Sequence, residues 1–165
     1  MNYPNIGQIK ILDTRGPWIT KSGGTLMVRA YLPLAMVMQE YFRYDTSELQ
    51  DVPSDIRGLR FYTVRNLPSG QIGGTEFHHI REEMVIGLEG KLRWKCEDVH
   101  GNKKEFMLTP ENGIWMPPFI LHAYEVLDNN SGIFVVANTL FVPDDTRTHD
   151  TFSTEKFREL QRTVR

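Results

Sequence analysis

The sequence predicts an all-β protein, built as an antiparallel sandwich or barrel. Short apolar runs recur along most of the 165-residue chain, and clusters of Gly, Pro, Asn and Asp separate them. Several runs alternate apolar with polar residues, which is the pattern of a half-buried strand. Helical spacing is clear only near the C-terminus, so strands dominate the predicted fold.

Length and charge narrow the possible functions. A 165-residue chain fits one domain and buries roughly 70% of its unfolded surface on folding. Its 19 basic and 21 acidic residues show no basic block, so nucleic acid is not an expected partner. No apolar run approaches the roughly 18 residues of a membrane span. Cys96 stands alone, and the N-terminus lacks a secretory pattern, so we expect a cytoplasmic protein with no membrane partner.

The N-terminal residues predict a strand over 6–12 that ends in the turn sequence 13–17. This prediction places Arg15 at the tip of a loop. An arginine there is either a solvated turn residue or a contact for a phosphate or a sugar, which its planar guanidinium suits.

Residues 24–57 carry a weaker pattern. An apolar run covers 25–31, and Pro33 then opens a stretch to residue 44 that fits a helix by its first residues and a strand by its aromatic content. Residues 45–57 are polar and predict a surface loop. We expect residues 33–57 to cover the mouth of the barrel or to reach a second subunit, and the alternative is an elaboration without catalytic consequence.

The remaining strands follow at regular intervals. Along 91–97 the alternation puts Cys96 on the inner face with Leu92 and Trp94, which predicts a buried structural thiol. The tail 153–164 has a capping serine and apolar residues at helical spacing, so it predicts a short amphipathic helix. The other predicted strands cover residues 59–64, 84–88, 105–108 and, as a central buried strand, 133–142.

Two stretches place polar side chains on predicted strands. A period of two puts Glu76 and His78 on one face of an extended chain, and His122 and Tyr124 share a face of another. We therefore expect the two histidines to converge although they are far apart in sequence. His79 points to the opposite face and is expected to be structural. Glu83 is either an inward carboxylate near His78 or an ordinary charge at a strand end.

The spacing of these residues resembles the two motifs of the cupin superfamily. In the first motif a glutamate takes the place of the first histidine, and the proline-to-histidine spacing of the second motif is kept. This resemblance implies a cupin double-stranded β-helix, which is a jelly-roll barrel, with a short C-terminal helix in a single domain spanning 1–165. The matching residues are Gly70, Glu76, His78, Glu83 and Gly90 in the first motif, and Pro117 and His122 in the second.

Within the cupins, the phrase Gly-Ile-Trp-Met-Pro-Pro-Phe-Ile-Leu-His at 113–122 resembles bacterial nucleotide-sugar 3,4-ketoisomerases. The similarity continues at 13–16, 60–64 and 144–152, and it leaves 24–57 as an inserted segment. The family implies isomerisation of a dTDP-linked 4-keto-6-deoxyhexose through an enediol, in the biosynthesis of deoxysugars for cell-surface polysaccharides such as lipopolysaccharide.

The resemblance also implies a site without a metal or another cofactor. By position the base is His78, and Tyr62, Tyr124 or a backbone donor stabilises the enediolate oxygen. A homodimer is expected because small barrels often protect exposed edge strands by pairing. The residues assigned in this way are His78, Glu76, Tyr62 and His122 for catalysis, and Arg15, Arg60, Glu83 and Tyr124 for substrate binding.

The chain departs from the ketoisomerase pattern in its first motif. The family's arginine is replaced by Gly73, its first histidine by Glu76, and its glutamine by Glu83. Two further functions therefore stay open. One is a metal-dependent oxygenase or lyase that uses Fe(II) or Mn(II). The other is a sugar-binding cupin without turnover. The metal ligands would be Glu76, His78, Glu83 and His122.

Overall fold

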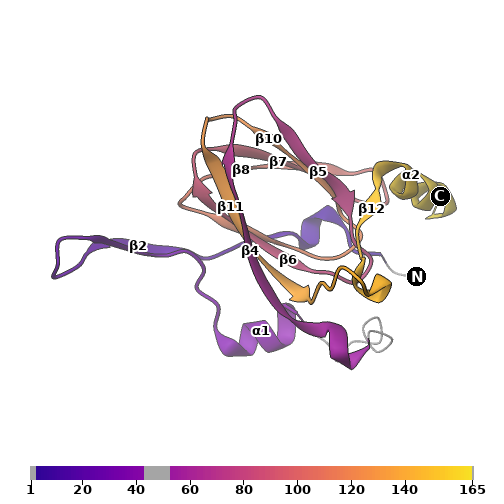
Figure 1. Ribbon diagram of the computed structural model, residues 1–165, viewed down its shortest axis with the longest axis horizontal. Helices are drawn as coiled ribbons and strands as arrows, with labels where there is room; N and C mark the ends of the chain where they lie inside the picture. The colour runs from indigo at the N-terminus through magenta and orange to yellow at the C-terminus, as the bar shows by residue number, and fades with distance from the viewer. Residues whose placement is uncertain (1–2, 43–52, 165) are drawn as a thin grey trace.

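The computed structural model describes residues 3–42 and 53–164, and it confirms the jelly-roll prediction. Two five-stranded sheets face each other, and every strand pairing in these residues is antiparallel (Figure 1). The first sheet contains, in order, β1 (Lys10–Ile11), β9 (Gly113–Met116), β6 (Glu83–Glu89), β11 (Ser131–Thr139) and β4 (Arg57–Leu67). The second contains β12 (Phe152–Ser153), β5 (Ile72–Phe77), β10 (Leu121–Val126), β7 (Leu92–Glu97) and β8 (Lys103–Leu108).

The main core lies between the two sheets. Along β7, Leu92, Trp94 and Cys96 are buried and alternate with half-buried charged residues, as the sequence predicts. They pack against alternate residues of the first sheet, among them Val85 and Val135. Burial raises the pKa of the Cys96 thiol to about 12, which agrees with a structural role. Alternation therefore fixes which side chains enter the barrel.

The described part of the inserted segment covers the outer face of the first sheet. Helix α1 (Leu34–Glu40) begins after Pro33, which settles the choice between helix and strand. Tyr41 packs edge-on against Trp115 at 5.3 Å, within a second apolar cluster on that face. Residues 33–42 therefore do not cover the barrel interior. The 3-10 helix η3 (Ser54–Ile56) precedes β4, which begins at Arg57, and residues 45–52 of the predicted loop lie outside the described residues.

The C-terminal helix confirms the prediction for the tail. Helix α2 (Thr154–Val164) lies beside β12 at one end of the second sheet (Figure 1), where it packs on an apolar cluster outside the main core. Its fully buried Phe157 contacts Phe77 edge-on at 5.1 Å. The helix thus covers the strand that carries Glu76. No helix among residues 3–42 and 53–164 is long and apolar enough to cross a membrane.

Two predictions for the N-terminal residues are wrong. The strand expected over 6–12 is reduced to β1, because Asn5 caps a 3-10 helix, η1 (Ile6–Gln8), through a reciprocal hydrogen-bond pair. Arg15 is not at a loop tip either, since it begins β2 (Arg15–Ile19). This strand pairs with β3 (Thr25–Val28) in a hairpin that projects from the barrel (Figure 1).

Candidate active site

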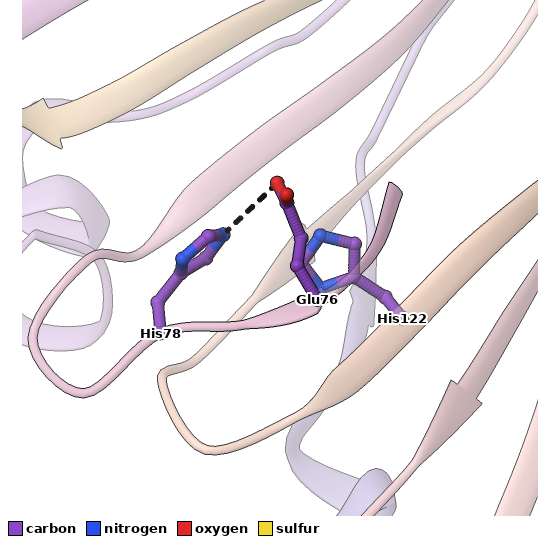
Figure 2. Close-up of side chains that lie close together, drawn as sticks. All are labelled: Glu76, His78 and His122. Carbon is purple, nitrogen blue, oxygen red and sulfur yellow. Dashed lines mark ion pairs between the residues drawn. The ribbon is translucent and has the colours of Figure 1, made fainter. Parts of the chain in front are cut away.

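Strands β5 and β10 bring the predicted histidines together inside the barrel. Glu76 pairs directly with His122 across the two strands, so both side chains lie on the inner face. A β-bulge interrupts the pairing of these strands at Gly74, whose positive φ of 72° is readily adopted by glycine. The side chains of Glu76, His78 and His122 converge (Figure 2), and their potential ligand atoms lie within 4.8 Å of one another. The His78 and His122 rings are 5.2 Å apart.

His78 is held as a neutral imidazole. Its Nδ1 lies 2.6 Å from the carbonyl oxygen of Asp150, which can only accept, so Nδ1 carries the proton. Nε2 therefore bears the lone pair and lies 3.9 Å from a carboxylate oxygen of Glu76 (Figure 2). Burial, followed by the charges of His122 and Arg81, lowers the pKa of His78 well below its usual value. The imidazole is thus unprotonated at neutral pH.

Arg81 is the principal site residue that our sequence reasoning missed. Its buried guanidinium lies against His78, with Nη2 2.7 Å from each ring nitrogen. An atom equally distant from both ring nitrogens lies over the face of the imidazole, so the guanidinium stacks on the ring and is not in line with the in-plane lone pair of Nε2. Nη2 also donates to Thr151 Oγ1 at 3.0 Å, and Nε lies 3.3 Å from Glu83 Oε1. Its position before a strand, beside two acidic residues, looks in the sequence like a surface charge.

Glu83 is the inward carboxylate of the two alternatives. Its Oε1 accepts a hydrogen bond of 2.9 Å from the Tyr62 hydroxyl and lies 3.8 Å from His78 Nε2. Its Oε2 lies 3.9 Å from His122 Nε2. Burial first, and the Glu83 charge second, raise the pKa of Tyr62, so its phenol stays protonated. The Glu83 carboxylate therefore lies between the two histidines and the Tyr62 hydroxyl.

Aromatic rings form one wall of the site. His122 and Tyr124 both stack on Trp94, with ring centroids 5.5 and 5.6 Å away. The Tyr124 ring lies directly over Gly73, where a Cβ would come within 2.5 Å of the phenol. Burial, and then Glu76, raises the pKa of Tyr124. The phenol thus occupies the space next to the position at which the ketoisomerase pattern has an arginine.

Asp150 positions the loop that carries His78 and Arg81. Its buried carboxylate accepts three backbone N–H groups, from His79 at 2.8 Å, Ile80 at 2.9 Å and Arg81 at 2.7 Å. Sequence reasoning did not assign this residue, although it lies within the stretch 144–152. His79 points away from the site and stacks on Phe152 at 4.0 Å, in keeping with its expected structural role.

The two arginines predicted to bind substrate lie in different places. Arg60 is on β4 beside Tyr62, 5.2 Å from its ring, and burial followed by the Arg81 charge lowers its pKa. Arg15 instead lies 3.6 Å from the Tyr31 ring and 3.2 Å from Asp13, near the base of the projecting hairpin. Of these two arginines, only Arg60 lies with the charged side chains of the barrel site in the described residues.

The donors in the barrel are of the kind that bind Fe(II) or Mn(II). A metal at Glu76, His78 and His122 would need the lone pair of His78 Nε2. The Arg81 guanidinium lies against this imidazole and 3.3 Å from Glu83, so a positive charge already stands among the donor atoms. As arranged, the residues do not fit a metal ion.

Comparison with protein families identifies the chain. The family model described as "WxcM-like, C-terminal" matches residues 44–157, which is more than half of the sequence. The chain belongs to this WxcM-like family. Among curated proteins, no relative matches the chain at a significant level.

Solved structures similar to this WxcM-like protein share its fold. One is WlaRB, a TDP-quinovose 3,4-ketoisomerase from Campylobacter jejuni, at 16% identity over 95% of this chain and 99% of that one, with a TM-score of 0.65. QdtA, a sugar 3,4-ketoisomerase from Thermoanaerobacterium thermosaccharolyticum, has 14% identity over 96% and 98%, with a TM-score of 0.64. The epimerase RmlC from Legionella pneumophila has 15% identity over 92% and 76%, with a TM-score of 0.58.

Proposed function

We propose that the protein is a sugar-nucleotide isomerase, and specifically a 3,4-ketoisomerase of dTDP-linked 4-keto-6-deoxyhexoses in deoxysugar biosynthesis. The observation that carries this proposal is the neutral His78, whose Nδ1–H is fixed on Asp150 while Nε2 is on the barrel side. The fold shared with WlaRB and QdtA supports it. A base of this kind is what removal of a proton next to a ketone requires.

The reaction moves protons between C3, C4 and their oxygens and needs no redox partner. His78 takes the proton from C3, the C3–H electron pair forms a C3–C4 double bond, and the C4 carbonyl oxygen becomes an enediolate oxygen. The proton of the C3 hydroxyl then passes to the C4 oxygen and a proton is delivered to C4, so that C3 becomes the ketone and C4 bears the hydroxyl. Substrate and product have the same composition, so atoms and electrons balance.

The neighbours of His78 have complementary parts in this proposal. Glu76 lies 3.9 Å from His78 Nε2 and its side chain is 38% exposed, so it can exchange the proton with solvent. The Arg60 guanidinium lies beside Tyr62 on the Glu83 side, where a cation stabilises enediolate oxygens, and the Tyr62 hydroxyl can turn its proton from Glu83 to the substrate. Because Gly73 stands where the ketoisomerase pattern has an arginine, anion binding falls to Tyr62 and Arg60 in this proposal.

Solvent isotope exchange tests the reaction directly. In deuterated buffer the enzyme is expected to exchange the C3 proton of dTDP-4-keto-6-deoxyglucose and to form the 3-keto isomer, both visible by NMR. Treatment with EDTA is expected to leave both rates unchanged. Exchange at C5 with an inverted centre would instead identify an epimerase. Tight binding without exchange would identify a sugar-binding protein, and activity restored by one metal would identify a metalloenzyme.

We also propose a homodimer, formed through the β2–β3 hairpin. Trp18, Ile19 and Leu26 on this hairpin are 50%, 76% and 47% exposed, and the hairpin strands pair only with each other in the described residues (Figure 1). A second copy would cover these side chains. Light scattering is expected to give a dimer for the wild type and a larger monomer fraction for Trp18→Ser. A monomeric wild type at micromolar concentration contradicts this proposal.

A further inference from the structure

We infer that Arg81 is a resident cation that takes the place a divalent metal would have in this barrel, so that its removal creates a metal site. The inference concerns the chemistry of the barrel cluster alone and does not depend on which sugar the protein binds. It also goes beyond the finding that a metal does not fit, because it names the residue that excludes the ion and predicts what replaces it.

The donor atoms already have spacings suited to a metal. Glu76, His78 and His122 offer three ligand atoms within 4.8 Å of one another (Figure 2). Glu83 adds one carboxylate oxygen 3.8 Å from His78 Nε2 and another 3.9 Å from His122 Nε2. Ligands on metal–nitrogen and metal–oxygen bonds of roughly 2.1 Å are spaced by distances of this order. Two imidazoles and two carboxylates suit Mn, Fe or Co.

Arg81 occupies the middle of this donor set. Its Nη2 is 2.7 Å from His78 Nε2 and 3.9 Å from Glu76 Oε1, while its Nε is 3.3 Å from Glu83 Oε1. One guanidinium therefore contacts three of the four groups that would hold the ion. An ion held by His78, Glu76 and Glu83 would have to displace the guanidinium, because the guanidinium lies among the same donor atoms.

The charges around Arg81 are also balanced without an ion. The cluster contains two carboxylates, Glu76 and Glu83, and two guanidinia, Arg81 and Arg60, whose charges act on each other. A divalent ion would add two positive charges beside the buried guanidinium of Arg81 and the half-buried one of Arg60, which is costly in a medium of low dielectric. The same balance explains how two acidic residues can replace neutral ones in the motif: Arg81 compensates them.

The test is binding of Co²⁺ alone to chelator-treated protein, measured by calorimetry and by the visible absorption of the bound ion. Wild type is expected to show no saturable site. Arg81→Met, which keeps the chain length and removes the charge, is expected to bind one equivalent on the order of 10³-fold more tightly, because a positive charge about 4 Å from the ion is gone. Arg81→Lys, which keeps a cation, is expected to resemble wild type.

Controls separate the site from other effects of the substitution. Adding His122→Ala to Arg81→Met is expected to abolish the Co²⁺ site, since it removes a ligand. Arg93→Met removes an arginine that pairs with Glu125 on the outer face and is expected to create no site. If Arg81→Met lacks a cooperative melt, Arg81→Met with Glu83→Gln removes the charged pair together and keeps three ligands. Tight Co²⁺ binding by wild type, or none by the folded variants, overturns the inference.

Discussion

His78→Asn is expected to lower kcat on the 4-keto sugar nucleotide by roughly 10² to 10⁴, the range typical of a lost general base. Asparagine keeps a donor of similar shape for the Asp150 carbonyl, so the loop has a partner in the variant. It has no lone pair of comparable basicity to take the C3 proton. Substrate affinity is expected to change little, because the proton transfer and not binding is impaired. Steady-state kinetics and C3 exchange in deuterated buffer measure both effects.

His100→Asn is the matched control, because His100 lies exposed in the turn between β7 and β8. It is expected to retain full activity and the same melting temperature. If His78→Asn kept more than a tenth of the wild-type kcat, His78 would not be the base. Glu76, the other group on that face, would then be the first replacement to examine.

Asp150→Ala is expected to have the largest effect on stability. The buried carboxylate accepts three backbone N–H groups at 2.7 to 2.9 Å, and alanine leaves all three without this partner. Hydrogen bonds to a charged group contribute about 1.5 to 3 kcal/mol each and are not additive, so we expect the free energy of unfolding to fall by about 3 kcal/mol. Activity is expected to fall as well, because the same loop carries His78 and Arg81.

Chemical denaturation measures this loss of unfolding free energy, and two further variants provide comparisons for its size. Asp150→Asn keeps one acceptor oxygen without the charge, so it is expected to lose less stability than alanine. Asp144→Ala removes an exposed carboxylate from the same segment and is expected to stay within about 0.5 kcal/mol of wild type. Equal stability of Asp150→Ala and wild type would show that water replaces the carboxylate.

The sequence predicted the barrel because alternation and turn residues act locally. Leu92, Trp94 and Cys96 are buried as expected, and the helix at the tail follows from its cap and spacing. The failures occur where a distant partner decides. At the N-terminus, the local cap formed by Asn5 and Gln8 is joined by a hydrogen bond from the backbone N–H of Ile6 to Asp98, a contact across 92 positions that no local pattern contains. An alternating apolar run there predicted a longer strand than the chain forms.

In the candidate site, too, local patterns predicted some positions, and contacts made only on folding decided the others. Period two and motif spacing were enough to bring Glu76, His78 and His122 to one face. Arg81 escaped notice because its neighbours in sequence are acidic and polar, and only the folded loop turns its guanidinium inward. The adjacent Glu82 faces the outer side, where it accepts from the Trp115 indole at 3.1 Å. Two neighbouring carboxylates thus serve opposite faces, a distinction that composition does not make.

The contact between Gly73 and Tyr124 limits which side chains of the ketoisomerase pattern can be introduced into this protein. Position 73 has room for no side chain while a phenol ring lies 2.5 Å from where its Cβ would be. Restoring an arginine at 73 alone would force that ring off Trp94, and with it the wall beside His122. The two positions form one steric unit, so an evolutionary or engineered path between this motif and the arginine-containing one must change both residues together.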